Sequence, residues 1–229
     1  MQLALDNPVW YALIGAHAEF AVGQGLARHY PRDVAPFSAV AEATDAAYAD
    51  LAADLPSGLE ARLFRPSDEP APAGWETVSA RPIVQMVADA APHGAMRDDL
   101  TVLGTDDTKD MVALAGIAKP GPFGPRTPWL GRYVGYRSAG RLLAMGGERF
   151  RVPEAVELSA ISVHPDARGA GLGSAITSFL VHSALARGET PFLHVFPDNP
   201  AVSLYRRLGF RERTRLWVIW RRLVAGTRP

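Results

Sequence analysis

The sequence of 229 residues contains no cysteine, which excludes disulfide bonds, thiolate metal sites and a cysteine nucleophile. It also has no apolar run near the about 18–20 residues that a membrane-spanning helix needs. The first residues lack the basic and apolar stretches of a secretory signal. We therefore expect a cytoplasmic protein without a membrane partner. The length suffices for one large domain or two small ones.

Lysine is nearly absent: it occurs only at positions 109 and 119, and arginine supplies the other cations. The net charge is zero, but residues 1–90 carry 12 acidic and 5 basic side chains, whereas residues 91–229 carry 12 acidic and 19 basic ones. The basic part could receive an anionic ligand, or it could attract the acidic part, and charge alone does not decide between them. No dense basic run with interleaved aromatic residues is present, so we expect no nucleic-acid partner.

The first 90 residues have a mixed pattern without a motif that carries chemistry. Apolar and small residues follow helical spacing over residues 8–23, and an alanine-rich stretch at 37–55 also predicts a helix. Short strands are expected at 62–64 and 83–87. Two proline-rich stretches, at 65–74 and 119–129, are typical of surface loops, because proline interrupts helices and central strands.

From about residue 100 the hydrophobic pattern becomes regular and predicts alternating strands and helices. Thr105-Asp106-Asp107 is typical of the N-terminus of a helix that reaches Ile117. Ser138-Ala139-Gly140 is typical of a turn between two paired strands. The expected order is strand, helix, two or three antiparallel strands, helix, strand, helix, strand. The strands are expected at residues 100–103, 132–137, 141–150, 156–163, 190–196 and 210–223, and the later helices from 172 and at 200–208.

The most informative motif lies between the strand that ends at Val163 and the helix that follows it. Arg168 is followed by alternating glycines at 169, 171 and 173, so bare main-chain N–H groups at a helix N-terminus could hold a diphosphate. A dinucleotide-binding fingerprint would need a third glycine where Ser174 stands. A phosphate-binding P-loop would need a Gly-Lys pair that this chain lacks.

A second motif, Asp198-Asn199-Pro200-Ala201-Val202-Ser203-Leu204-Tyr205-Arg206-Arg207-Leu208-Gly209-Phe210, follows the first by about one helix and one strand. With Arg168, Gly171 and Gly173, it resembles the GNAT superfamily of acyl-CoA-dependent N-acyltransferases over roughly residues 100–223. The start of the chain, Pro8-Val9-Trp10, and the second proline-rich loop resemble the subgroup with an additional N-terminal domain, as in glycine N-acyltransferase-like proteins.

The resemblance implies a mixed α/β (α+β) fold. A mostly antiparallel sheet with a splayed central strand pair would be flanked by helices. We expect an N-terminal α/β extension over residues 1–95 and the GNAT domain over residues 96–229. The resemblance also implies acetyl-CoA as co-substrate and no metal. The residues that it implies for CoA binding are Ile161, Ser162, Val163, Arg168, Gly169, Ala170, Gly171, Leu172, Gly173, Ser174 and Asn199.

The strand edge at residues 161–163 could pair with the amide groups of the pantetheine arm, as an added strand would. The N–H of Ile161 could polarise the thioester carbonyl. Asn199 could bind the same arm, although capping the following helix would also explain an asparagine at this position. The resemblance gives Tyr205 the role of the acid that protonates the departing thiolate. A buried core tyrosine is the alternative.

Glu157 begins the strand that leads to the glycine-rich loop, and we predict it as the base that takes a proton from the amine. Alternation along the strand would place its side chain on one face with Ser159, Ile161 and Val163. A solvated carboxylate at a strand end is the alternative. His194 and Glu148 are weaker candidates for the base.

The sequence therefore predicts an N-acetyltransferase in which an amine attacks acetyl-CoA directly in a ternary complex. The acceptor would be a small-molecule or peptide amine, and the protein a monomer or a homodimer. A non-catalytic acyl-CoA sensor is the alternative in another class, and a nucleotide-dependent oxidoreductase is a third.

Overall fold

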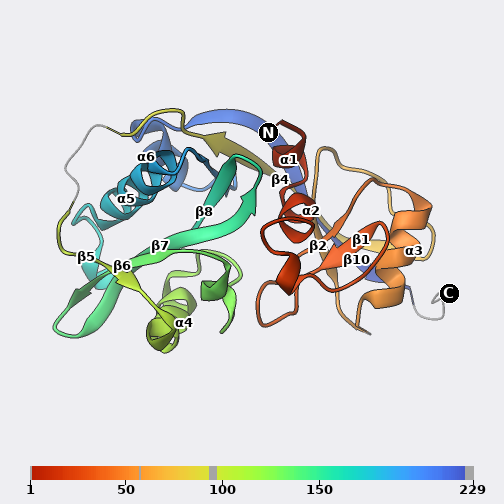
Figure 1. The fold of residues 1–229 in the computed structure, drawn as a ribbon, viewed down its shortest axis with the longest axis horizontal. Helices are drawn as coiled ribbons and strands as arrows, with labels where there is room; N and C mark the ends of the chain where they lie inside the picture. The colour runs from red at the N-terminus through yellow and green to blue at the C-terminus, as the bar shows by residue number, and fades with distance from the viewer. Residues whose placement is uncertain (1, 57, 93–96, 225–229) are drawn as a thin grey trace.

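The computed structural model of the protein describes residues 2–56, 58–92 and 97–224 (Figure 1). Its centre is an eight-stranded sheet with the strand order β3-β10-β4-β9-β8-β7-β6-β5, in which only β8 and β9 pair in parallel. The strands are β3 (Ala61–Arg65), β4 (Trp75–Val87), β5 (Leu100–Leu103), β6 (Tyr133–Ser138), β7 (Arg141–Val152), β8 (Ala155–Val163), β9 (Thr190–Val195) and β10 (Arg211–Leu223).

A separate two-stranded sheet pairs β1 (Ala27–His29) with β2 (Ser38–Val40). The α-helices are α1 (Gln2–Asp6), α2 (Pro8–Leu13), α3 (Asp45–Asp54), α4 (Thr108–Ala118), α5 (Leu172–Ala186) and α6 (Ala201–Arg207). Four short 3-10 turns complete the described elements: η1 (Ala18–Phe20), η2 (Thr105–Asp107), η3 (Thr127–Leu130) and η4 (Pro165–Ala167). No helix in the described residues is both long and apolar enough to cross a membrane.

The regular part of the sequence folds as its pattern predicts. The hairpin of β6 and β7 turns at Ala139 and Gly140, which both have positive φ angles, and Ser138 pairs with Arg141 across it. Helix α5 buries an apolar stripe at Leu172, Ile176 and Leu180, because residues four positions apart share one face of a helix. α5 packs on β7 and β8, and α4 also packs on these two strands (Figure 1). Strand and helix order from residue 100 onward is confirmed.

The central strand pair is splayed. β8 and β9 pair only from Ala155 opposite Thr190 to Glu157 opposite Phe192, and beyond this point they have no paired residues. β9 turns to β4 instead, with Val84 opposite Val195. The remaining edge of β8 therefore has no partner in β9. This mixed, mostly antiparallel sheet with a splayed pair confirms the expected fold class.

Two expectations for the N-terminal part are wrong. Residues 37–55 do not form one helix: β2 comes first, and α3 begins only after Thr44, whose hydroxyl accepts the N–H of Ala47 at 3.2 Å. Residues 8–23 hold the short α2 and a 3-10 turn instead of a continuous helix. High alanine content favours a helix locally, but burial of β2 against its neighbours determines the fold of residues 38–40.

The N-terminal part contributes directly to the large sheet. β4 lies between β9 and β10, and β3 pairs with the other edge of β10. One hydrophobic cluster unites Leu5 and Phe37 with Phe150, Phe192 and Leu216. The expected division at residues 95 and 96 falls within 93–96, outside the described residues. The two-domain division stays a prediction, but strands from both sides of it share one sheet.

Candidate active site

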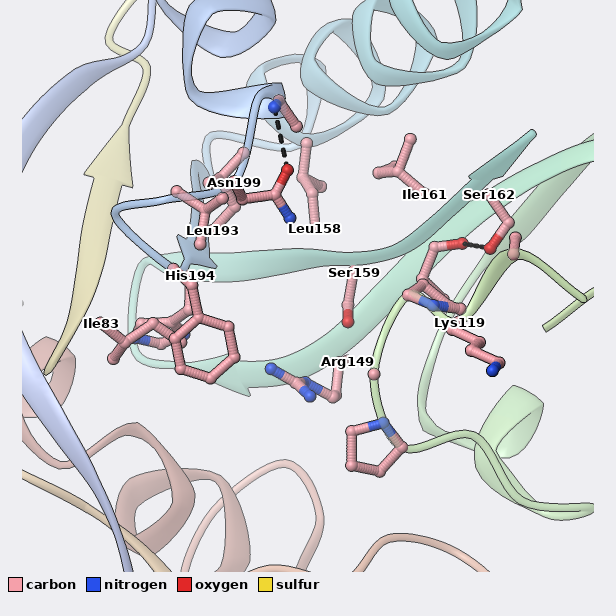
Figure 2. A pocket seen from close by; sticks show the side chains of 18 of the residues that line it. Ile83, Lys119, Arg149, Leu158, Ser159, Ile161, Ser162, Leu193, His194 and Asn199 are labelled. Atoms are coloured by element: carbon pink, nitrogen blue, oxygen red, sulfur yellow. Dashed lines mark hydrogen bonds between the residues drawn. The ribbon is translucent and has the colours of Figure 1, made fainter. Parts of the chain in front are cut away.

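A cavity of about 500 Å³ lies where β8 and β9 diverge. It is lined by residues of β3, β4, β7, β8, β9 and β10, by Phe37 and Arg168, by the loop that follows α4 and by α6 with the loop before it (Figure 2). Of the residues predicted from the sequence, those that line it are Ile161, Ser162, Val163, Arg168, Asn199, Tyr205 and His194. The fold thus brings together residues from both sequence motifs.

Strand β8 contains a bulge beside this cavity. Ala160 has a φ of 56°, and Met145 and Gly147 of β7 are paired with Ser162 and Ser159. Two residues of β8, Ala160 and Ile161, therefore have no partner in β7. A bulge leaves main-chain groups outside the ladder and changes the direction of side chains. The N–H of Ile161, which the sequence analysis assigns to the thioester carbonyl, lies in this irregular segment.

The bulge corrects the expected alternation of side chains along β8. Ile161 and Val163 pack with Leu158 against the cluster under α5, whereas Glu157 contacts Arg149 on the other side. Figure 2 shows Ile161 and Ser159 on opposite sides of β8. The expectation that Glu157, Ser159, Ile161 and Val163 share a face is therefore wrong, because the extra residue reverses the alternation.

The glycine-rich loop has the conformation that its glycines allow. Gly169 and Gly171 have φ angles of 82° and 73°, and Gly171 is the N-cap of α5. A Cβ atom placed on either glycine would meet no protein atom within 4 Å. Arg168, Gly169, Ala170 and Gly171 are exposed. The space outside this turn is therefore open to a ligand.

The start of α5 adds main-chain donors to this open space. Gly171 is the N-cap residue of α5, and its carbonyl accepts a hydrogen bond from the N–H of Ala175 at 3.0 Å. The amides of Leu172, Gly173 and Ser174 belong to the first turn, whose N–H groups have no partner within a helix. Such a helix start attracts anions. This cradle fits a diphosphate.

Tyr205 of α6 lies at the cavity wall with its ring edge against Phe210, at a centroid distance of 5.8 Å. Within the described part of the chain its hydroxyl has no hydrogen-bond partner. Burial raises the pKa of Tyr205 to about 12. The phenol is therefore protonated at neutral pH and can donate a proton or a hydrogen bond into the cavity.

Asn199 caps helix α6 and also lines the cavity. Its Oδ1 atom accepts the N–H of Ala201 at 2.9 Å, which satisfies one free donor at the start of α6 (Figure 2). Its Nδ2 donates to no other described residue. The Asn199 side chain can therefore cap α6 through Oδ1 and bind a ligand through Nδ2 at the same time.

Glu157 is fully buried and held by two cationic or polar partners. Arg149 donates to its two oxygens at 2.7 and 2.6 Å, and His194 Nδ1 lies 2.7 Å from Oε1. Burial alone would raise the pKa of Glu157, but the Arg149 charge and the hydrogen bonds from Arg149 and His194 outweigh it and hold the pKa at about 2. Glu157 does not itself line the cavity. These contacts favour a role in positioning its partners over a role as base.

His194 is a neutral link in a buried chain of hydrogen bonds. Gln85 Oε1 accepts from Arg213 at 2.7 Å, so Gln85 Nε2 is the donor to the carbonyl of Leu5 and to His194 Nε2. His194 Nδ1 must then carry the proton that it shares with Glu157. Burial lowers the pKa of His194, although Glu157 opposes this effect. Both ring nitrogens of His194 thus take part in hydrogen bonds, Nε2 with Gln85 and Nδ1 with Glu157.

Glu148, the third candidate for the base, lies away from the cavity. It is buried on β7, where Arg151 and Arg187 donate to it at 2.7 and 2.6 Å. It faces a different hollow, beside His17 and Trp129. This arrangement separates Glu148 from the other predicted site residues.

Sequence reasoning missed the arginines of the cavity. Arg149 and Arg62 line it together with Lys119 and Arg168. The chain has many arginines, and no local motif singles out these two. Their importance depends on strand pairings between residues far apart in the sequence. Among the described residues, no group of three or more His, Asp or Glu side chains could hold a metal ion.

The chain is similar to known proteins both in sequence and in structure. Residues 133–218 match the family model "FR47-like protein". A solved structure described as an acetyltransferase from the GNAT family of Novosphingobium aromaticivorans is 34% identical to this chain. It has a TM-score of 0.88, and the match covers 96% of this chain and 99% of that one.

The chain belongs to the GNAT family. Among curated relatives, the mycothiol acetyltransferase of Streptomyces avermitilis is 32% identical over 162 residues, which cover 68% of this chain and 44% of the relative. That of Saccharomonospora viridis is 38% identical over 82 residues, or 35% of this chain and 26% of the relative. The chain thus spans less than half the length of the curated relatives it matches. The curated relatives and the solved structure share the description acetyltransferase.

Proposed function

We propose that this GNAT protein is an N-acetyltransferase that transfers an acetyl group from acetyl-CoA to the amine of an acceptor. The observation that carries the proposal is the open cradle of positive-φ glycines at the start of α5, next to a strand edge that β9 leaves unpaired. A diphosphate fits the cradle, and an amide-containing arm fits the edge. The two features are contiguous, as a ligand with both groups requires.

In this proposal, main-chain and side-chain groups of both sequence motifs bind the parts of acetyl-CoA. Main-chain amides of residues 168–174 bind the diphosphate, and Ile161, Ser162 and Val163 bind the arm. Asn199 adds a side-chain donor through Nδ2. When bound, acetyl-CoA supplies an activated thioester. The N–H of Ile161 polarises its carbonyl oxygen, as a fixed dipole aimed at developing charge.

Transfer needs two proton movements besides the new bond. The amine nitrogen bonds to the acetyl carbon, the carbon–sulfur bond breaks, and Tyr205 gives the departing sulfur a proton. The phenol can take this role because burial raises its pKa, so that it carries a proton at neutral pH. The attacking nitrogen loses its own proton to water, and water returns a proton to the Tyr205 phenolate, so the side chain regains its starting state. No covalent enzyme intermediate is required.

Glu157, predicted from the sequence as the base, has a different role in this proposal. A carboxylate with a pKa of about 2 is a weak acceptor for an amine proton. Its bidentate pair with Arg149 instead fixes the guanidinium at the cavity wall, and its contact with His194 fixes the imidazole. We therefore propose Glu157 as a positioning residue.

Some finer expectations also remain proposals. The resemblance of the N-terminal part to glycine N-acyltransferase-like proteins, the cytoplasmic location and a monomeric or homodimeric state belong to this group. The curated relatives are named mycothiol acetyltransferase. We propose only the shared acetyl transfer for this chain.

Release of free thiol from acetyl-CoA tests the function directly. The protein is incubated with acetyl-CoA and a broad panel of amines, including amino acids, amino sugars and peptides. We expect amine-dependent thiol release with at least one acceptor and the matching N-acetyl product by mass spectrometry. Binding of CoA without turnover of any amine would favour the sensor instead.

A further inference from the structure

The cavity carries positive charge without any negative side chain at its wall. Arg62, Lys119, Arg149 and Arg168 line it, and among the described residues no aspartate or glutamate does. Arg168 belongs to the loop proposed for the diphosphate, and Lys119 caps α4. Arg62 and Arg149 have no such assignment. A cationic acceptor such as a lysine-rich peptide would meet like charges here, which is unfavourable.

Arg62 is held in place by an aromatic ring. It lies opposite Trp220 in the pairing of β3 with β10, and its guanidinium carbon is 4.0 Å from the centre of the Trp220 ring. Its N–H groups donate to no other described residue. Stacking fixes the plane of the guanidinium and leaves its edge free for an anion. Arg62 is thus pre-organised without a bound partner.

Arg149 also has a free donor that faces the cavity. Its Nε and one terminal nitrogen bind Glu157, whereas its other terminal nitrogen, Nη1, donates to no described residue. The guanidinium carbon lies 4.9 Å from the ring centre of Phe37 and 4.5 Å from that of Phe150. Figure 2 shows the guanidinium of Arg149 directed into the open space beside Ser159.

These two arginines are separated from the part of the cavity proposed for CoA. Figure 2 places Arg149 and Ser159 on one side of β8 and Ile161 and Asn199 on the other. Arg62 stands on β3, at the far edge of the sheet from β8. The walls beside the arginines are apolar and aromatic. These apolar residues are Phe37, Phe64, Ile83, Val218 and Trp220.

We propose that the amine acceptor carries a carboxylate, which Arg62 and Arg149 Nη1 bind, and an apolar body that lies against Phe37 and Phe64. This inference rests on the proposed acetyl transfer and names its acceptor class: an amino acid or a closely similar amino carboxylate. A guanidinium donates to a carboxylate with charge assistance. The aromatic walls favour an apolar side chain. Binding of the carboxylate would position the amine near Ile161 of β8, where the thioester is proposed to lie.

Binding of acetylated products tests the inference without depending on turnover. N-acetyl derivatives of glycine, leucine, phenylalanine and tryptophan are titrated calorimetrically, each beside its carboxamide, with and without CoA. Acetylation removes the titratable amine, so each pair differs only in the carboxylate. We expect the apolar carboxylates to bind at least about tenfold more tightly than their amides, as charge-assisted hydrogen bonds allow.

A matched pair of variants locates the effect. Arg62→Gln should abolish most of the difference between acid and amide. Arg215→Gln removes the same charge from an exposed position of β10, where Arg215 pairs with Glu212, and should preserve the difference. We avoid replacing Arg149, because its loss would leave Glu157 buried without a counter-charge.

The outcomes separate this inference from the function on which it rests. Equal affinity for acids and amides, or no binding of any acid, would overturn the carboxylate site. An unchanged preference in Arg62→Gln would overturn it as well. Thiol release with amines that lack a carboxylate would then leave the transferase function standing. Tight carboxylate binding without turnover of any amine would overturn the function and retain the site.

Discussion

The side chains of the cavity differ in how they can be identified. Tyr205 and Asn199 lie in one short motif, so the sequence alone places Asn199 just before one helix and Tyr205 within it. Arg149, Glu157 and His194 come from three strands, and their mutual contacts depend on pairings that no local pattern encodes. The sequence therefore indicates the candidate acid. It does not show that the candidate base is bound to an arginine.

Removal of the Tyr205 hydroxyl tests the proposed acid. Tyr205→Phe keeps the ring against Phe210 and removes the only group that could protonate the departing sulfur in this account. We expect kcat to fall about 100-fold, within the range of general acid catalysis, and the KM for acetyl-CoA to stay unchanged. Steady-state thiol release measures both values. An unchanged kcat would show that Tyr205 is only a core aromatic residue.

The pH profile of Glu157→Gln distinguishes a base from a positioning residue. The pKa of Glu157 is lowered to about 2, so the carboxylate is ionised throughout any practical assay range. We expect the variant to raise the acceptor KM through a less ordered Arg149 and to retain the pH dependence of kcat/KM between pH 6 and 9. Loss of an ionisation from that profile would restore Glu157 as the base.

The lowered pKa of Glu157 also makes the free energy of unfolding depend on pH. A carboxylate with a lowered pKa contributes stability above its unfolded pKa, here near 4.5, and this contribution is lost as the pH falls toward 2. The unfolding transition of Glu157→Gln should therefore depend less on pH over this interval than that of the parent chain. Circular dichroism also verifies that the variant is folded before its kinetics are compared.

Secondary-structure elements show where local pattern is sufficient. Helix α5 and the strands from β5 to β9 were predictable because each has a clear period and a turn residue at its end. The bulge at Ala160 was not predictable, since alanine rarely adopts a positive φ and nothing near it marks an irregular strand. β2 was missed because tertiary burial outweighs the helix propensity of its alanine-rich surroundings.

A pair of glycine variants at the two ends of α5 tests the cradle. Gly171 precedes the helix with a φ of 73°, and Gly188 follows it with a φ of 74°. A Cβ atom would meet no protein atom within 4 Å at either position. Gly171→Ala and Gly188→Ala should therefore lose similar stability, about 1 kcal/mol, measured by chemical unfolding.

Of the two variants, only Gly171→Ala should change the affinity for CoA. We expect Gly171→Ala to weaken CoA binding by about tenfold or more, because its methyl group occupies space needed by the diphosphate. Gly188→Ala should bind CoA as the parent chain does. Calorimetry measures both affinities. Equal affinity of the two variants would mean that the diphosphate does not approach Gly171.

The whole molecule depends on pairings between its two ends. β10 pairs with β3 and β4, both of which precede residue 95. No local pattern could reveal that β4 is inserted between β9 and β10, because the insertion joins strands more than 100 residues apart. The later strands are therefore predictable from the sequence, whereas the place of β3 and β4 in the same sheet is not.

Truncation measures whether residues 96–229 fold alone. Without β3 and β4, β10 would lose both of its strand partners, and the cluster around Phe150 would lose Leu5 and Phe37. We expect the shortened chain to show no cooperative thermal transition, in contrast to the full chain. A cooperative transition together with CoA binding would support the two-domain division predicted from the sequence.

A crystal structure of the protein with CoA tests the central claim most directly. The account predicts diphosphate oxygens within about 3 Å of main-chain nitrogens between residues 168 and 174, with the pantetheine arm along residues 161–163. The sulfur should then lie beside the Tyr205 hydroxyl. A diphosphate bound elsewhere, with this loop empty, would contradict the account.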